Sequence, residues 1–118
     1  MTKTFRDLKV WQKSHDLTLK IYRITKQFPG EEKFGVISQL RRAASSIPTN
    51  IVEGFKRRST KEYSHFLNIA DSSLEETKYH LILSLDLEYL RKKDFEDLEE
   101  LCNEIGRMLN GLQKKLNI

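Results

Sequence analysis

The chain has 118 residues and a net charge of +4, with 38% hydrophobic and 32% charged residues. This length predicts one domain, residues 1–118, with a buried core. No apolar run is long enough to cross a membrane, and the first residues lack the apolar core of a signal peptide. The single cysteine, Cys102, cannot form an internal disulfide, so we expect a cytoplasmic protein.

The charges are distributed unevenly along the chain. Residues 1–58 contain thirteen Lys and Arg against five acidic residues, whereas residues 59–118 contain eight against twelve. Such a split predicts a basic surface and an acidic one. Solvated helix faces with complementary neighbours would explain the same split without any binding function.

The first element is predicted to be an amphipathic helix ending at about Gln27. Thr4 and Asp7 have the spacing of a capping box at its start. Apolar or small residues then recur every three or four positions, as in the core-facing seam of a helix. This seam consists of Val10, Ser14, Leu17, Ile21, Ile24 and Phe28.

The second helix is predicted over roughly residues 33–57, after a break at Pro29 and Gly30. Pro48 lies in its middle, lacks an amide hydrogen and crowds the carbonyl of Ala44. We therefore predict a kink at Pro48 and a carbonyl oxygen that needs another donor. Gly54 marks either a close approach of a neighbouring helix or the point where this helix frays. The seam consists of Ile37, Leu40, Ala44, Ile47, Ile51 and Gly54.

Two further helices complete an all-α, antiparallel up-down-up-down four-helix bundle, because the connections are short. Ser59 and Glu62 form a capping box before a third helix that ends at about Leu90. Its two adjacent apolar seams predict a second interface, within the bundle or between chains. We expect the basic run 91–93 at its carboxyl end, followed by Asp94 as the cap of the fourth helix.

The sequence shows no recognisable catalytic apparatus. Glu62 and His65 have the Glu-x-x-His spacing of metal ligands on one helix, but di-iron bundles need this motif twice. Cys102 lies on an apolar stripe and is predicted to be a core thiol. Three glutamates, at 53, 75 and 76, could meet inside the bundle but have no acid–base partner. We therefore predict no enzyme activity, no metal, no cofactor and no small-molecule substrate.

Basic residues on the first two helices are the remaining candidates for function. Lysines and arginines on rigid helices bind phosphates by releasing counterions, without reading sequence. Antiparallel neighbours would merge the two sets into one nucleic-acid-binding stripe for RNA or DNA. The alternative is a protein–protein assembly or adaptor module with no nucleic-acid ligand. The candidate residues are Arg6, Lys13, Lys20, Arg41, Arg42, Lys56, Arg57 and Arg58.

Nearly the whole chain resembles a known family in three places. These are the opening FRDLKVW at residues 5–11, the Phe28-Pro29 break, and the stretch ISQLRRAASSIPTNIVEGFKRRS that begins at Ile37. The proline within a helix makes the resemblance specific. In these features the chain is similar to the bacterial 23S rRNA intervening-sequence protein family, often called "four helix bundle protein".

The resemblance implies a small helical bundle that assembles as a homo-oligomer, in many members a ring-like pentamer. No enzymatic activity is established for the family, whose name records gene location. A similar fold in the accessory protein of diversity-generating retroelements associates with a reverse transcriptase and nucleic acid through a basic ring surface. Structured rRNA is therefore an expected ligand. The family's recurrent positions correspond to Arg41, Arg42, Pro48, Asn50, Glu53 and Gly54.

Overall fold

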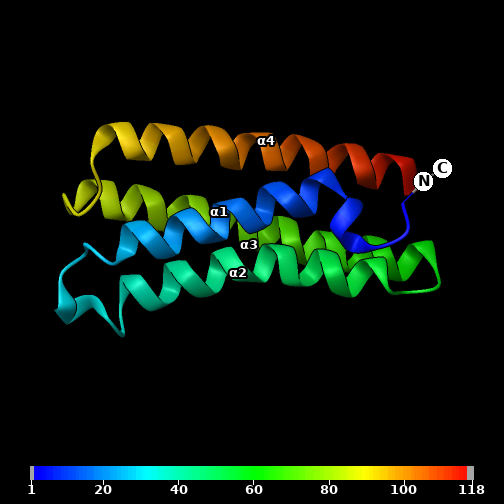
Figure 1. The fold of residues 1–118 in the computed structure, drawn as a ribbon, viewed down its shortest axis with the longest axis horizontal. Coiled ribbons are helices and arrows are strands. Elements are labelled where there is room, and N and C mark those ends of the chain that lie inside the picture. Colours follow the sequence, from blue (N-terminus) through cyan, green and yellow to red (C-terminus); the bar gives the residue numbers. More distant parts are fainter. Residues whose placement is uncertain (1, 117–118) are drawn as a thin grey trace.

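The computed structural model describes residues 2–116 and consists of four long helices and two short 3₁₀ turns, with no strand in that range (Figure 1). Each long helix packs against its neighbours in sequence, and α1 also packs against α4, which closes the bundle. The predicted all-α, up-down-up-down bundle is confirmed. The elements are η1 (Phe5–Asp7), α1 (Lys9–Thr25), η2 (Gly30–Glu32), α2 (Val36–Phe55), α3 (Thr60–Asp86) and α4 (Lys92–Leu116).

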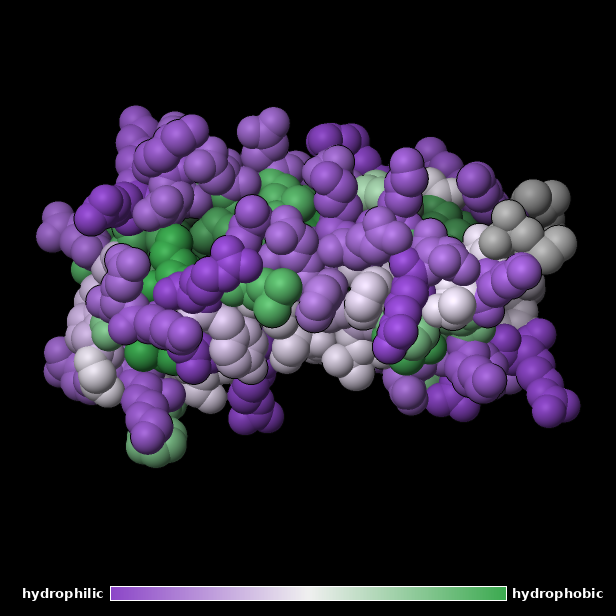
Figure 2. All heavy atoms as spheres, in the orientation of Figure 1, coloured by the Kyte–Doolittle hydropathy of each residue, from purple (hydrophilic) through white to green (hydrophobic). Residues whose placement is uncertain are grey.

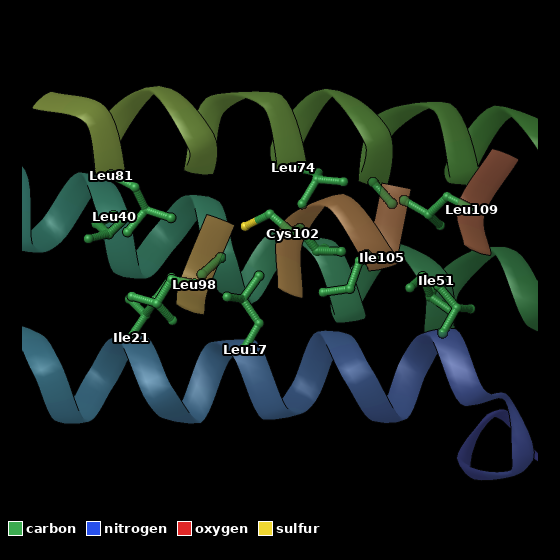
Figure 3. Close-up of a cluster of buried hydrophobic side chains, with 14 of the residues drawn as sticks. Leu17, Ile21, Leu40, Ile51, Leu74, Leu81, Leu98, Cys102, Ile105 and Leu109 are labelled. Carbon is green, nitrogen blue, oxygen red and sulfur yellow. The ribbon is translucent and has the colours of Figure 1, made fainter. Parts of the chain in front are cut away.

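The core runs the length of the bundle and is made by the predicted seams (Figure 3). All four helices contribute side chains that are fully removed from water, and each such side chain contributes about 1.5–3 kcal/mol of hydrophobic stabilisation. Periodicity therefore identified the correct face of every helix. The largest of these side chains are Leu17, Ile21, Leu40, Ile47, Ile51, Leu67, Leu74, Leu81, Ile105 and Leu109.

Helix ends differ from the predictions where tight turns replace the outer helical turns. The Thr4–Asp7 capping box forms, but it caps η1, and α1 begins only at Lys9. Residues 30–32 form η2, so α2 begins at Val36, whose amide donates to the Glu32 carboxylate at 3.3 Å. That carboxylate caps a helix terminus that has no capping side chain at position 35.

The prediction for the turn between α3 and α4 was wrong. Glu88 has φ 65°, a left-handed conformation that ends the helix, so α3 stops at Asp86 and not near Leu90. Helix α4 begins at Lys92, so the predicted cap, Asp94, lies in the first turn. Residues 92 and 93 of the basic run therefore belong to the start of α4, not to the carboxyl end of α3.

Helix α2 continues through Pro48 without interruption from Val36 to Phe55. The predicted partner for the free carbonyl exists: the Thr18 hydroxyl of α1 lies 3.2 Å from the Ala44 oxygen and 2.9 Å from the Ser14 oxygen. One hydroxyl of α1 thus compensates for the amide hydrogen that proline lacks in α2. A kink at Pro48 stays a prediction.

Helices α2 and α3 form the most extensive pair in the bundle. A Cβ added at Gly54 would lie 2.9 Å from Tyr63 Cδ1 and 3.0 Å from Phe66 Cβ, so this glycine permits close approach. Helix α3 thus places Tyr63 and Phe66 against α2 and Leu74 against α4, beside Gly106. At these positions, the double seam serves two neighbours within the bundle.

Candidate nucleic-acid interface

One end of the bundle gathers positive charge from three separate segments. The amino-terminal residues, the α2–α3 turn and the carboxyl end of α4 meet there, as Figure 1 shows at its right side. Contacts hold them together: η1 packs against α2, and Gln113 Nε2 donates to the Ser64 carbonyl at 3.4 Å. We define the basic end as Lys3, Arg6, Lys9, Lys56, Arg57, Arg58, Lys61, Lys114 and Lys115.

Positive charge at the basic end is almost uncompensated. All nine side chains are on exposed residues, and the same segments carry only three carboxylates. Asp7 accepts from the Thr4 amide and Glu62 from the Ser59 hydroxyl, so both are engaged in helix caps. Within residues 2–116, only Arg57 among the nine has a carboxylate within 4.0 Å, that of Glu53 at 3.5 Å.

Arg57 is also the most constrained residue of this group. Its guanidinium carbon lies 4.6 Å from the centroid of the Phe66 ring, so the side chain lies across α3. Among the described residues, Lys56 and Arg58 have no carboxylate within 4.0 Å and no aromatic ring beneath the charged group. Both are exposed. They are therefore the more available cations of the α2–α3 turn.

Arg41, predicted as a phosphate contact, fastens two helices together. Its Nε donates to Thr25 Oγ1 at 2.8 Å and its Nη2 donates to the Tyr22 carbonyl at 3.2 Å. The guanidinium carbon also lies 4.7 Å from the Tyr22 ring centroid. Arg41 thus satisfies carbonyl and hydroxyl groups in the last turn of α1, which explains its place in the sequence without a ligand.

Two predicted lysines, Lys13 and Lys20, lie on the side of α1 that faces α4, whereas Arg41 contacts α1 from α2. Lys13 Nζ is 3.6 Å from Glu104 Oε1 of α4, and Lys20 Nζ is 3.5 Å from Asp16 Oδ2. Arg42 lies elsewhere again, on an exposed part of α2 beside Ser46 and a shallow polar depression shared with α3. The eight predicted residues therefore do not form one stripe along α1 and α2.

Four of the nine residues of the basic end were predicted from the sequence, and five were not. Arg6, Lys56, Arg57 and Arg58 were predicted and are brought together. The missed members come from segments that lie far apart in the chain but meet once the topology is drawn, because up-down-up-down order places both termini beside the α2–α3 turn. These are Lys3, Lys9, Lys61, Lys114 and Lys115.

Two further positions that the family resemblance singles out, Asn50 and Gly54, have roles within the bundle. Asn50 Nδ2 donates to the carbonyl and the hydroxyl of Ser46, at 2.8 and 3.0 Å. Ser46 Oγ in turn accepts from Ser73 Oγ at 2.9 Å, which links α2 to α3. Together with Gly54, these residues form a small polar seam that stabilises the closest helix pair.

Candidate catalytic groups do not converge in the structure. Within residues 2–116, no three His, Cys, Asp or Glu side chains come together as a set of metal ligands. The glutamates at 53, 75 and 76 do not meet: each is exposed and lies beside a different basic residue three or four positions further along the chain. Burial raises the pKa of the Cys102 thiol to about 12, which makes it a poor nucleophile at neutral pH.

Comparison with known proteins agrees with the fold. A crystal structure of a protein of unknown function from the S23 ribosomal protein family of Bacteroides thetaiotaomicron superposes with a TM-score of 0.80 at 28% identity. The match covers 89% of this chain and 98% of that one. No curated protein matches the chain, and none of the helices in the described residues is long and apolar enough to span a bilayer. The sequence model of the family described as "23S rRNA-intervening sequence protein" matches residues 6–111, so the chain belongs to this family.

Proposed function

We propose that the protein is a non-enzymatic nucleic-acid-binding bundle whose basic end holds the phosphate backbone of RNA. The observation that supports this proposal is the concentration of nine exposed cations, eight without a carboxylate within 4.0 Å in residues 2–116. Unpaired cations attract polyanions and release condensed counterions on binding. We also propose a cytoplasmic location, since a lone reduced cysteine suits that compartment.

The expected binding mode is contact with the backbone, without reading of base sequence. Among residues 2–116, no short helix projects from the bundle toward a groove, and the basic end lacks a platform of exposed aromatic rings. Affinity should therefore follow the shape and charge density of the RNA. Structured RNA, which presents closely spaced phosphates, is the preferred ligand class in this proposal, and structured rRNA is one such RNA to test.

A salt titration with a matched pair of variants tests this proposal. Fluorescence anisotropy with a labelled structured RNA should show binding that weakens steeply between 50 and 300 mM salt. The double variant Lys56→Glu/Arg58→Glu should bind about tenfold more weakly and with a shallower salt slope, because two cations are lost. These two residues are preferable to Arg57, whose packing on Phe66 couples charge to stability.

The control places the same charge change at the other end of the bundle. Lys26 and Lys92 are exposed at the ends of α1 and α4, and no carboxylate lies within 4.0 Å of either among the described residues. Lys26→Glu/Lys92→Glu should keep the affinity within about twofold. Equal losses in both double variants would show that only net charge matters, and absent binding at 50 mM salt would refute the proposal.

Self-assembly is the second candidate, favoured by large apolar side chains that the chain leaves in water. Phe34 is 88% exposed and Tyr79 is 57% exposed, values unusual for aromatic residues of a monomer. We propose a homo-oligomer, and the ring-like pentamer that the family resemblance implies is the first arrangement to examine. Native mass measurement without RNA and then with RNA separates the candidates: a monomer at high concentration contradicts assembly.

A further inference from the structure

A groove of about 610 Å³ lies between α1 and α4, on the side of the molecule away from the α2–α3 pair. Figure 2 shows apolar atoms exposed in this region between flanking hydrophilic side chains. The floor of the groove consists of Ile24 from α1 and of Leu98 and Leu101 from α4. Of the neighbouring helix pairs, α1 and α4 make the least contact, so the groove is a part of the bundle that its own helices do not fill.

The apolar floor belongs to seams that the sequence pattern assigns to the core: Ile24 to that of the first helix, and Leu98 and Leu101 to the apolar stripe of the fourth helix that also contains Cys102. Leu98 is buried to 4% exposure, but Ile24 and Leu101 are only half-buried, although both occupy seam positions. A seam residue that the chain's own core does not cover remains available to another apolar surface. The groove extends from Asp94 to Glu104, about 15 Å at 1.5 Å per residue, or nearly three helical turns.

The walls of the groove are acidic. Five carboxylates face two cations, Lys20 and Arg23, both of which lie on the α1 wall. Exposed ion pairs occupy three of these carboxylates, but such pairs contribute little and exchange partners easily. Asp94 and Glu100 have no basic group within 4.0 Å among residues 2–116. The carboxylates are those of Asp16, Asp94, Asp97, Glu100 and Glu104.

We propose that the α1–α4 groove binds a cationic amphipathic helix of a partner protein. Such a helix would place its apolar stripe on Ile24, Leu98 and Leu101 and its lysines or arginines against the α4 wall, where four carboxylates line the groove. Charge complementarity selects this occupant: a nucleic acid would be repelled here, whereas it is attracted to the basic end. The groove is thus a second surface, with the opposite charge preference.

A synthetic peptide can test the groove without knowledge of the natural partner. The probe is a fluorescent 14-residue peptide of leucine and lysine with helical spacing, and its scrambled sequence controls for charge alone. We expect the amphipathic peptide to bind the intact protein and the scrambled one to bind at least about tenfold more weakly, a difference of about 1.4 kcal/mol. Equal binding of the two peptides would overturn the proposal.

Two charge-reversal variants locate the site. Asp94→Lys/Glu100→Lys changes the groove wall and should weaken binding of the peptide about tenfold. Glu96→Lys/Glu99→Lys makes the same charge change on exposed positions of α4 outside the groove and should leave affinity within about twofold. Similar losses of peptide affinity in both variants would overturn the proposal. It would also be overturned if the peptide fails to bind and the groove variant dissociates a homo-oligomer, because a second copy of the chain would then occupy the groove.

Discussion

The α2–α3 pair and the α1–α4 pair use the same kind of amphipathic helix but pack very differently. Between α2 and α3, Gly54 and the hydrogen-bonded serines 46 and 73 let the two backbones approach closely. Between α1 and α4, a lysine–glutamate pair, Lys13 and Glu104, bridges the helices and a groove remains. The size of the side chains at the helix edge, more than the apolar stripe itself, decides which pair is closed.

This difference separates structural from functional parts of the chain. The closed pair contains Ser46, Asn50 and Gly54, whose contacts all lie within the bundle. The groove and the basic end are instead built from helix flanks and termini, whose side chains have few partners. We therefore expect the binding functions of this protein at the groove and at the basic end, not at the α2–α3 pair.

The largest expected effect comes from placing a charge in each of the two regions. Ile47→Asp puts an unpaired carboxylate at a fully buried position and should cost about 4 kcal/mol or more, enough to unfold a marginal domain. Leu101→Asp puts the same group on the groove floor, where water reaches it, and should cost about 1 kcal/mol. Urea denaturation followed by circular dichroism measures both. Similar losses of unfolding free energy in the two variants would mean that water is excluded from the groove floor as it is from the core.

A smaller effect is expected from adding one methyl group to glycines in helices. Gly54→Ala should destabilise by about 1–3 kcal/mol, because the new Cβ would lie 3.2 Å from the Tyr63 carbonyl oxygen, a backbone atom that cannot move aside cheaply. Gly111→Ala is the control: nothing lies within 4 Å of its Cβ position, so helix propensity alone should stabilise by up to about 1 kcal/mol. Thermal melting of the two variants should shift in opposite directions, and a stabilised Gly54→Ala would contradict the close approach.

Most of the fold could be predicted from the sequence, since periodicity specifies which face of each helix is buried. Gly54 and the carbonyl of Ala44 were also predictable, because a glycine and a proline inside a helix have few structural explanations. Helix ends were less predictable: Glu88 adopts a left-handed conformation that its residue type does not suggest. The α3–α4 turn was misplaced for that reason.

The candidate site was harder to predict than the fold, for a physical reason. A basic surface depends on which side chains remain unpaired, and pairing is a property of neighbouring helices. Arg41 has the same sequence character as Arg42, yet only the structure shows its bonds to Thr25 and Tyr22. Lys114 and Lys115 lie in the last turn of the acidic helix α4, and only the structure shows that this turn reaches α3 near the α2–α3 turn, where Gln113 donates to the Ser64 carbonyl.

The smallest predicted effect concerns the hydroxyl that connects α1 to the proline site of α2. Thr18→Val removes the donor to the Ala44 carbonyl and should cost about 1 kcal/mol, because a partly buried acceptor loses its partner. Pro48→Ala restores the backbone amide that normally bonds to residue 44, so Thr18→Val should cost less in that background. The difference between the two costs is a coupling energy, measured by a double-mutant cycle in urea. A coupling near zero would mean that the Thr18 hydroxyl serves only the Ser14 carbonyl of its own helix, and the hydrogen bonds between α1 and α2 would then be those of Arg41.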